Sequence, residues 1–163
     1  MMAANNQALI QTFYEAFSKL DYKTMNTCYA SDATFSDSAF KNLTSKQTQA
    51  MWHMLCSRAK DFTLTFKDVE ASESAGSCHW EPIYTFSSTG RKVHNKIEAK
   101  FWFKDGKIVK HEDFFSFYRW SQMALGPIGY LLGWSSFLQN KVRKTALSSL
   151  HSFIKKHPEY QEK

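Results

Sequence analysis

The sequence predicts an α+β fold in which helices pack on one face of a curved antiparallel sheet. Apolar residues recur at helical spacing before residue 60, whereas from Asp61 onward they alternate with polar residues, as they do in strands. A run of helices followed by a run of strands is typical of α+β proteins rather than of alternating α/β proteins. Helices on one face of such a sheet would leave a concave pocket between the two layers.

Two helices are expected at the N-terminus. Asn5 or Asn6 can cap the first helix, because a short polar side chain can accept a hydrogen bond from a free backbone N–H of the first turn. Apolar residues then recur every three or four positions, at Leu9, Ile10, Phe13, Phe17 and Leu20. Asp21 can cap a second, shorter helix that ends near Tyr29.

A short strand and a third helix come next. Residues 33–37 read ATFSD and predict a strand in which Phe35 and Asp37 lie on the same side. Asp37 can either reach the mouth of the pocket or cap the turn that follows it. Thr44 opens a capping box, with Gln three positions later, and predicts a helix to about residue 58.

Four strands in a meander are predicted after residue 61. The last two are joined by Asp105-Gly106, one of the strongest short signals for a β-hairpin. Pro82 lacks a backbone donor and therefore suggests an edge strand or a bulge. The predicted strands are Phe62–Ser72, Cys78–Phe86, Val93–Phe103 and the second arm of the hairpin within Phe101–Tyr118.

The second arm of this hairpin carries the main chemical candidates. His111 and Asp113 are two residues apart, so in a strand both side chains point to the same face. Val109 and Phe115 are expected on that face as well. An imidazole and a carboxylate among apolar neighbours can form a general acid–base pair. The alternatives are that both groups face solvent, or that they form a satisfied polar pair in a pocket without chemistry.

Composition limits the other classes of function. The net charge of +6 is spread over the chain without a polybasic arm, so a solvated basic surface is predicted and not a nucleic-acid site. Three cysteines without a C-x-x-C pair predict reduced thiols, no disulfides and no structural metal in a cytoplasmic protein. Serine-nucleophile, phosphate-loop and dinucleotide motifs are absent, so no cofactor is expected.

Residues 121–163 are expected to form a C-terminal helical extension, outside a domain that spans residues 1–120. Gly126 and Pro127 break the chain, and Ser135 or Ser136 can cap a last helix. The apolar residues that precede this helix predict a lid over the pocket or an arm that locks a dimer. The alternative is a membrane-surface anchor formed by residues 121–156.

Two segments carry a resemblance to a known family. Residues 29–37 (YASDATFSD) and residues 105–115 (DGKIVKHEDFF) resemble the SnoaL-like proteins, and the resemblance extends over residues 6–118. This family shares a superfamily with nuclear transport factor 2, ketosteroid isomerase, limonene epoxide hydrolase and scytalone dehydratase. The resemblance implies a cone-shaped barrel, with three helices closing its mouth, that often dimerises through the outer face of the sheet.

The resemblance also implies roles for particular residues. In the polyketide-cyclase branch, a His and an Asp two apart on this late strand face the pocket, which assigns Asp113 as acid–base group and His111 as its partner. Proteins of this family often have an acidic residue three positions later, where this chain has Ser116.

We therefore expect a protein that binds a hydrophobic, oxygen-bearing small molecule. It would act without a cofactor as an isomerase, cyclase, dehydratase or epoxide hydrolase. The alternatives are a non-catalytic ligand-binding or dimerisation module of the same fold and a peripheral membrane protein. The candidate catalytic residues are Asp113, His111 and Asp37, and the candidate pocket residues are Tyr14, Trp52, Phe35 and Phe115.

Overall fold

The computed structural model describes the whole chain, residues 1–163, and confirms the α+β class. Its strands form one curved sheet in the order β1-β6-β5-β3-β2, and β4 pairs with β3. All neighbours are antiparallel except β1 and β6, which run parallel. The strands are β1 (Tyr29–Ser36), β2 (Thr63–Ala71), β3 (Ala75–Phe86), β4 (Arg91–His94), β5 (Ile97–Lys104) and β6 (Lys107–Phe114).

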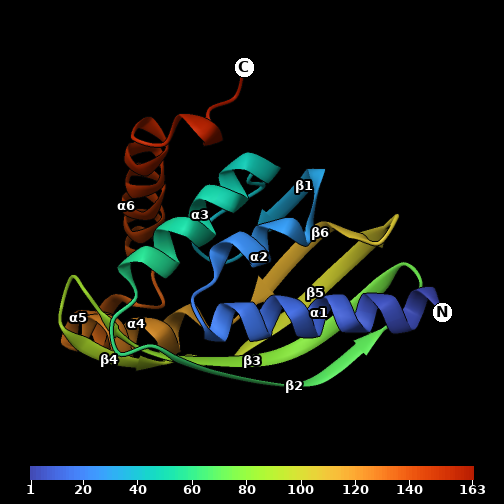
Figure 1. Ribbon diagram of the computed structural model, residues 1–163. Coiled ribbons are helices and arrows are strands. Elements are labelled where there is room, and N and C mark those ends of the chain that lie inside the picture. Colours follow the sequence, from blue (N-terminus) through green and yellow to red (C-terminus); the bar gives the residue numbers. More distant parts are fainter.

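Three N-terminal helices cover one face of the sheet, and three further helices follow β6 (Figure 1). Helix α1 packs on β2, α3 packs on β1, and α6 lies against α3. None of these helices combines the length and the apolar character needed to cross a bilayer. The helices are α1 (Met2–Ser18), α2 (Tyr22–Thr27), α3 (Ser45–Arg58), α4 (Phe117–Leu125), α5 (Pro127–Leu132) and α6 (Ser136–Lys155), with a 3₁₀ turn η1 (Pro158–Tyr160).

The helix caps of α2 and α3 are confirmed, but that of α1 is not. Asp21 accepts a hydrogen bond from the N–H of Thr24, and Thr44 forms the complete capping box. Helix α1 begins at Met2 without a side-chain cap. Asn6 is instead buried, and its amide donates to two backbone carbonyls of the β2–β3 turn. Asn6 therefore ties α1 to the sheet.

The meander differs from the prediction in one strand. The predicted strand Val93–Phe103 is interrupted at Asn95 and Lys96, and it forms the two strands β4 and β5. The interruption lies opposite Pro82, whose carbonyl accepts from the N–H of Asn95 at 3.1 Å. Pro82 lies neither on an edge strand nor at a bulge of β3. It lies where the partner of β3 changes from β5 to β4.

The C-terminal segment is more helical than predicted. The break at Gly126 and the cap at Ser135 are confirmed, but helices α4 and α5 were not predicted. Helix α4 buries Trp120, Ser121 and Ala124, which recur at helical spacing, so the sequence carried a period here that the prediction missed. It packs on β4.

Candidate functional site

Strand β6 places the imidazole and the carboxylate of the predicted pair together on the concave face. His111 is fully buried and Asp113 is 5% exposed. Val109 does not share this face, because β6 carries a bulge there: Phe103 pairs with Ile108, whereas Trp102 pairs with Lys110. The extra residue shifts the alternation by one position, so that Ile108, and not Val109, is buried below His111.

A chain of hydrogen bonds joins this pair to three aromatic side chains. His111 Nε2 lies 2.9 Å from Asp113 Oδ1, and His111 Nδ1 lies 2.8 Å from the hydroxyl of Tyr29. The indole N–H of Trp52 donates to that hydroxyl at 2.9 Å. The indole N–H of Trp80 donates to Asp113 Oδ1 at 3.4 Å. The carboxylate is therefore held from two sides inside the fold.

One assignment of protons to the side chains is consistent with all the hydrogen bonds of this network. An indole can only donate, so the Tyr29 oxygen accepts from Trp52 and its own proton is free to donate to Nδ1 of His111. Nε2–H of His111 then donates to an ionised Asp113. A charged imidazole would donate to Tyr29 from Nδ1 and leave the Tyr29 proton without an acceptor. The geometry thus favours a neutral His111 that orients a carboxylate.

Aromatic rings fill the space around His111. Tyr14, Trp52 and Phe35 lie in this filled interior, where each is at most 2% exposed. The hydroxyl of Tyr14 is buried without a hydrogen-bond partner, and burial raises the pKa of Tyr14 well above its usual value. Tyr14 therefore remains a protonated donor without an acceptor. The rings nearest to the imidazole are Phe101 at 4.3 Å, Phe35 at 5.0 Å, Phe13 at 5.7 Å and Trp52 at 6.1 Å between centroids.

A concavity opens to solvent where strands β1 and β6 end. Its volume is about 260 Å³, and most of its lining residues are polar. Asp113 and Phe115 lie on its wall, whereas His111, Tyr14, Trp52 and Phe35 do not. The lining residues are Ser36, Asp37, Ser38, Lys41, Glu112, Asp113, Phe114, Phe115 and Arg143.

Asp37 lies in the same concavity, because Ser36 pairs with Glu112 in the parallel β1–β6 ladder. One oxygen of Asp37 accepts from the N–H groups of Ala39 and Phe40, each at 2.7 Å. Asp37 therefore caps the turn and also faces the concavity, which combines the two predicted roles. Burial raises the pKa of Asp37 to about 6, although the N–H of Phe40 opposes the shift.

Three residues of the site were not predicted as site residues: Arg143, Tyr29 and Trp80. Trp52 was predicted as a pocket residue. Arg143 comes from α6, and its Nε donates to the carbonyl of Ser38 at 2.8 Å. Tyr29 was expected at the end of a helix, but it begins β1 and lies beside β6. Parallel pairing of strands that are far apart in the chain leaves no local sequence signal.

A second group of histidines and carboxylates lies on the opposite, outer face of the sheet. His79 Nε2 is 2.7 Å from Glu81 and His94 Nε2 is 2.6 Å from Glu81, while Nδ1 of His79 bonds Glu98. Hydrogen bonds from His79 and His94 lower the pKa of Glu81 to about 2. The hydrogen bonds that His79 makes with Glu81 and Glu98 raise the pKa of His79. These hydrogen bonds join residues of the neighbouring strands β3, β4 and β5. Dimerisation through this outer face stays a prediction.

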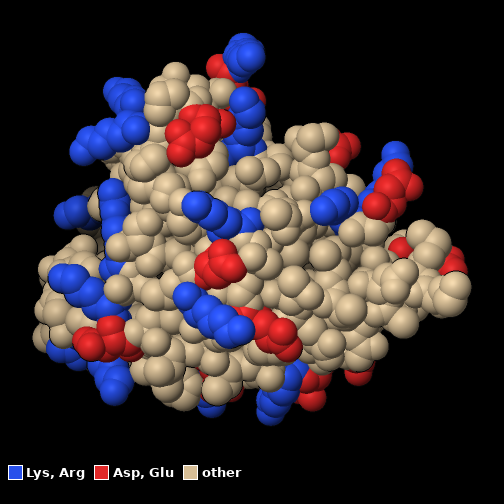
Figure 2. Space-filling view, in the orientation of Figure 1, with Lys and Arg blue, Asp and Glu red and all other residues tan.

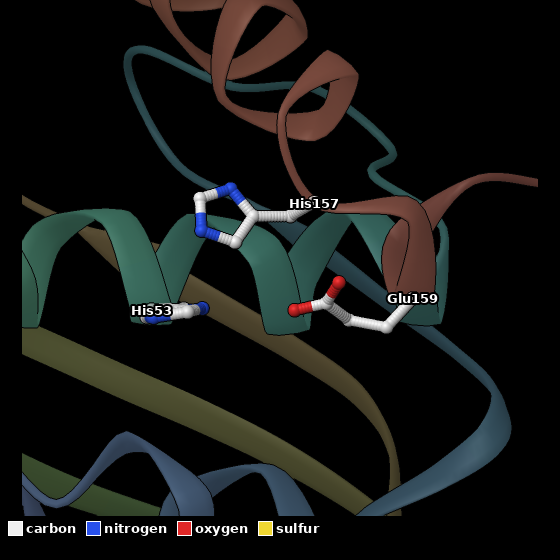
Figure 3. A group of neighbouring side chains, drawn as sticks. All are labelled: His53, His157 and Glu159. Atoms are coloured by element: carbon white, nitrogen blue, oxygen red, sulfur yellow. The ribbon is translucent and has the colours of Figure 1, made fainter.

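A third group joins α3 to the chain that follows α6 (Figure 3). His53, His157 and Glu159 each bring one donor atom within 4.8 Å of the others. Nδ1 of His53 lies 3.0 Å from the hydroxyl of Tyr160, and Nδ1 of His157 donates to the carbonyl of Phe153 at 2.8 Å. Nε2 of His157 is therefore available to a ligand, and Nε2 of His53 is available in the tautomer in which Nδ1–H donates to Tyr160.

Comparisons with known proteins agree with this architecture. A sequence profile described as SnoaL-like domain matches residues 10–111. An LEH-like epoxide hydrolase from M. tuberculosis superposes with a TM-score of 0.66 at 16% identity, over 80% of this chain and 97% of the other. A putative polyketide cyclase from Silicibacter sp. TM1040 superposes with a TM-score of 0.66 at 15% identity, over 76% and 98%. No curated protein matches the chain.

Proposed function

Since the chain belongs to the family of proteins with a SnoaL-like domain, we propose that it binds a hydrophobic, oxygenated small molecule and moves a proton on it without a cofactor. The observation that carries this proposal is the pair of carboxyl groups, Asp37 and Asp113, in one concavity. Their surroundings differ, and acid and base roles are commonly separated in this way.

In this proposal Asp113 is the base. Its carboxylate is fixed by hydrogen bonds from His111 and Trp80, which hold it ready to take a proton from a carbon beside a carbonyl group. His111 is a positioning residue. Asp37 donates its own proton to another atom of the substrate, because a carboxyl with a pKa of about 6 is partly protonated near neutral pH. Asp113 then releases its proton to the solvent of the concavity and Asp37 takes one up, so both groups regain their starting states.

Basic side chains on the wall support the same chemistry. Arg143 and Lys41 line the concavity together with the two carboxyl groups. Positive charge at this position would stabilise the oxyanion that develops when a proton leaves a carbon beside a carbonyl. Isomerisation, aldol cyclisation and dehydration all pass through such a step, and epoxide opening needs the same acid–base pair.

The first test is Asp113→Asn. We expect at least a hundredfold loss of turnover with little loss of stability, because the amide keeps the shape of the carboxylate but cannot accept the proton. Assays would follow isomerisation of a β,γ-unsaturated cyclic ketone, exchange of its α-protons in D₂O, and hydrolysis of terpene-sized epoxides. Glu98→Gln, on the outer face of the sheet, is the matched control. Turnover that survives in Asp113→Asn would assign the chemistry to other residues.

A non-catalytic ligand-binding or dimerisation module is the second candidate function. It is favoured by the aromatic side chains that fill the interior and by the complete set of hydrogen bonds around His111. This candidate predicts binding of the same ketones and epoxides, measured calorimetrically, without turnover in the wild type.

A further inference from the structure

Six large apolar side chains are exposed on and just after α5. Trp134, Phe137 and Leu131 are each 70% exposed, although side chains of this kind are usually buried. We call this set the α5 patch. Its members are Ile128, Tyr130, Leu131, Leu132, Trp134 and Phe137.

The patch is held by a tightly packed helix pair. Gly129 of α5 lies so close to α4 that a Cβ at this position would be 1.9 Å from the carbonyl oxygen of Ser121. The indole N–H of Trp134 donates to the carbonyl of Leu131 at 2.9 Å, and the hydroxyl of Ser135 donates to that of Leu132 at 2.6 Å. The apolar side chains are therefore presented on a fixed backbone and do not hang from a loose loop.

The net charge of the protein comes from the segment of the chain that contains this patch. Residues 114–158 contain no Asp or Glu, whereas the rest of the chain contains fifteen Lys or Arg and fifteen Asp or Glu. The whole net charge of +6 therefore comes from this segment. Its basic residues are Arg119, Lys141, Arg143, Lys144, Lys155 and Lys156.

Helix α6 arranges part of this charge in line with the patch. Phe137, Lys141, Lys144, His151 and Lys155 recur at helical spacing, and all five are exposed. In Figure 2, Lys and Arg atoms lie at the upper left of the molecule, where α6 stands in Figure 1. The apolar surface therefore continues directly into a basic one.

We propose that the α5 patch and the basic face of α6 form a membrane-docking surface for a bilayer with anionic lipids. Trp134 and Tyr130 suit the interface of a bilayer, Phe137 and Leu131 reach the acyl boundary, and Lys141 and Lys144 face the head groups. A second copy of the chain fits this surface less well, because two copies would bring together two segments of charge +6.

Docking in this way would also place the concavity near the lipid. Arg143, on its wall, lies six residues after Phe137, which is about 9 Å along a helix. A hydrophobic ligand could then enter from the bilayer. This consequence rests on the proposed function, whereas membrane binding does not, so binding is measured without any ligand.

The test is cosedimentation of the full chain with vesicles. We expect binding to vesicles of 70% phosphatidylcholine and 30% phosphatidylserine, and at least tenfold weaker binding to pure phosphatidylcholine. Trp134→Ser with Phe137→Ser should weaken binding at least tenfold, and Lys141→Glu with Lys144→Glu should do the same. Two control variants change exposed residues outside residues 114–158: the single variant Leu55→Ser and the double variant Lys67→Glu with Lys104→Glu. Vesicle binding by both controls should stay within twofold of that of the wild type.

Two results would overturn the proposal. One is no binding of the wild type to the anionic vesicles. The other is a combination of two observations. Light scattering would show a wild-type dimer that dissociates in the double variant Trp134→Ser with Phe137→Ser, and neither protein would bind vesicles. This combination would assign the patch to a contact between two copies of the chain. As a readout independent of sedimentation, the blue shift of tryptophan fluorescence on vesicle addition should disappear in Trp134→Phe.

The group of His53, His157 and Glu159 carries a second, independent inference. From it, we infer a Zn²⁺ site that clasps the end of the chain to α3. Two imidazole nitrogens and a carboxylate are common zinc ligands. Nε2 of His157 is free because its Nδ1–H donates to a carbonyl, and Nε2 of His53 is free when its Nδ1–H donates to the hydroxyl of Tyr160, an arrangement typical of metal-bound histidines. Glu159 is exposed and can rotate to close the distance that zinc needs.

The test is titration of the purified chain with Zn²⁺ and Co²⁺. We expect micromolar binding, a higher midpoint of thermal unfolding and a visible Co²⁺ spectrum. His157→Ala should lose at least tenfold in affinity, whereas His151→Ala, an exposed histidine of α6 outside the group, should bind as wild type does. Equal affinity in these two variants, each shown to be folded by circular dichroism, would overturn the inference.

Discussion

Two strands of the same sheet each carry a histidine and a carboxylate two residues apart, and the two pairs are in opposite environments. His111 and Asp113 face the concave side, where both are buried among aromatic rings. His79 and Glu81 face the outer side, where their side chains are 17% and 23% exposed. The same spacing thus produces either a closed interior dyad or a surface network, depending only on which face the strand turns inward.

The partners of the two pairs show what each environment demands. The interior dyad is completed by groups with a fixed number of protons, two indoles and a phenol, so that both nitrogens of His111 and Oδ1 of Asp113 have partners. The outer pair is completed by further charged groups, His94 and Glu98. Water can screen these charges, so their arrangement need not be complete.

The largest expected effect is that of His111→Ala. This change leaves Asp113 buried without its main partner, leaves Tyr29 without an acceptor, and opens a cavity between the surrounding rings. We expect a loss of about 3 to 5 kcal/mol in the free energy of unfolding, measured with urea. His79→Ala is the matched control. A similar loss in both variants would mean that burial does not separate the two pairs.

Asp37→Asn is expected to have the next largest effect, and the effect depends on pH. The pKa of Asp37 is raised from 3.8 to about 6, so the folded state favours the protonated form. Its contribution to stability is full below pH 4 and is lost as the pH rises through 6. Because Asn can accept both backbone N–H groups without ionising, it avoids this loss.

The free energy of unfolding of Asp37→Asn, relative to that of the wild type, should therefore increase by about 3 kcal/mol between pH 4 and pH 7. This value follows from the shift of the Asp37 pKa from 3.8 to about 6, at about 1.4 kcal/mol per pKa unit. Urea unfolding at a series of pH values measures it. A pH-independent difference between the two proteins would show that Asp37 titrates near its usual value in the fold.

The sequence was sufficient for the elements with local signals. The hairpin at Asp105-Gly106 has positive φ angles at both residues, as such a turn requires, and the cap at Thr44 depends on neighbours within one turn. The shared face of His111 and Asp113 follows from their spacing alone. These predictions needed no information about distant parts of the chain.

The errors came from contacts between distant segments. The bulge at Val109 depends on the register with β5, and the split of the strand from Val93 to Phe103 depends on Pro82 in β3. The position of Arg143 at the concavity depends on how α6 packs. No local period records such events, so Asp113 and Asp37 could be predicted as candidates, whereas Arg143 and the strand pairing that brings the two carboxyl groups together could not.

The smallest expected effect is that of His79→Gln on the outer face. The folded-state pKa of His79 is raised, so its contribution to stability is full below pH 6.5 and is lost as the pH rises through the raised value. The pKa of Glu81 is lowered to about 2, so its contribution is full above pH 4.5 and is lost toward pH 2.

The difference in stability between wild type and His79→Gln should therefore be largest between pH 4.5 and pH 6.5. The difference should be small because the pairs are exposed, and 1 M NaCl should remove most of it because salt screens exposed charges. Urea unfolding at pH 5.5 and pH 8.5, with and without salt, measures both effects. If the difference persists in 1 M NaCl, the outer network is shielded from water, as it would be inside a dimer, and the contrast with the interior dyad would then hold only for a single chain.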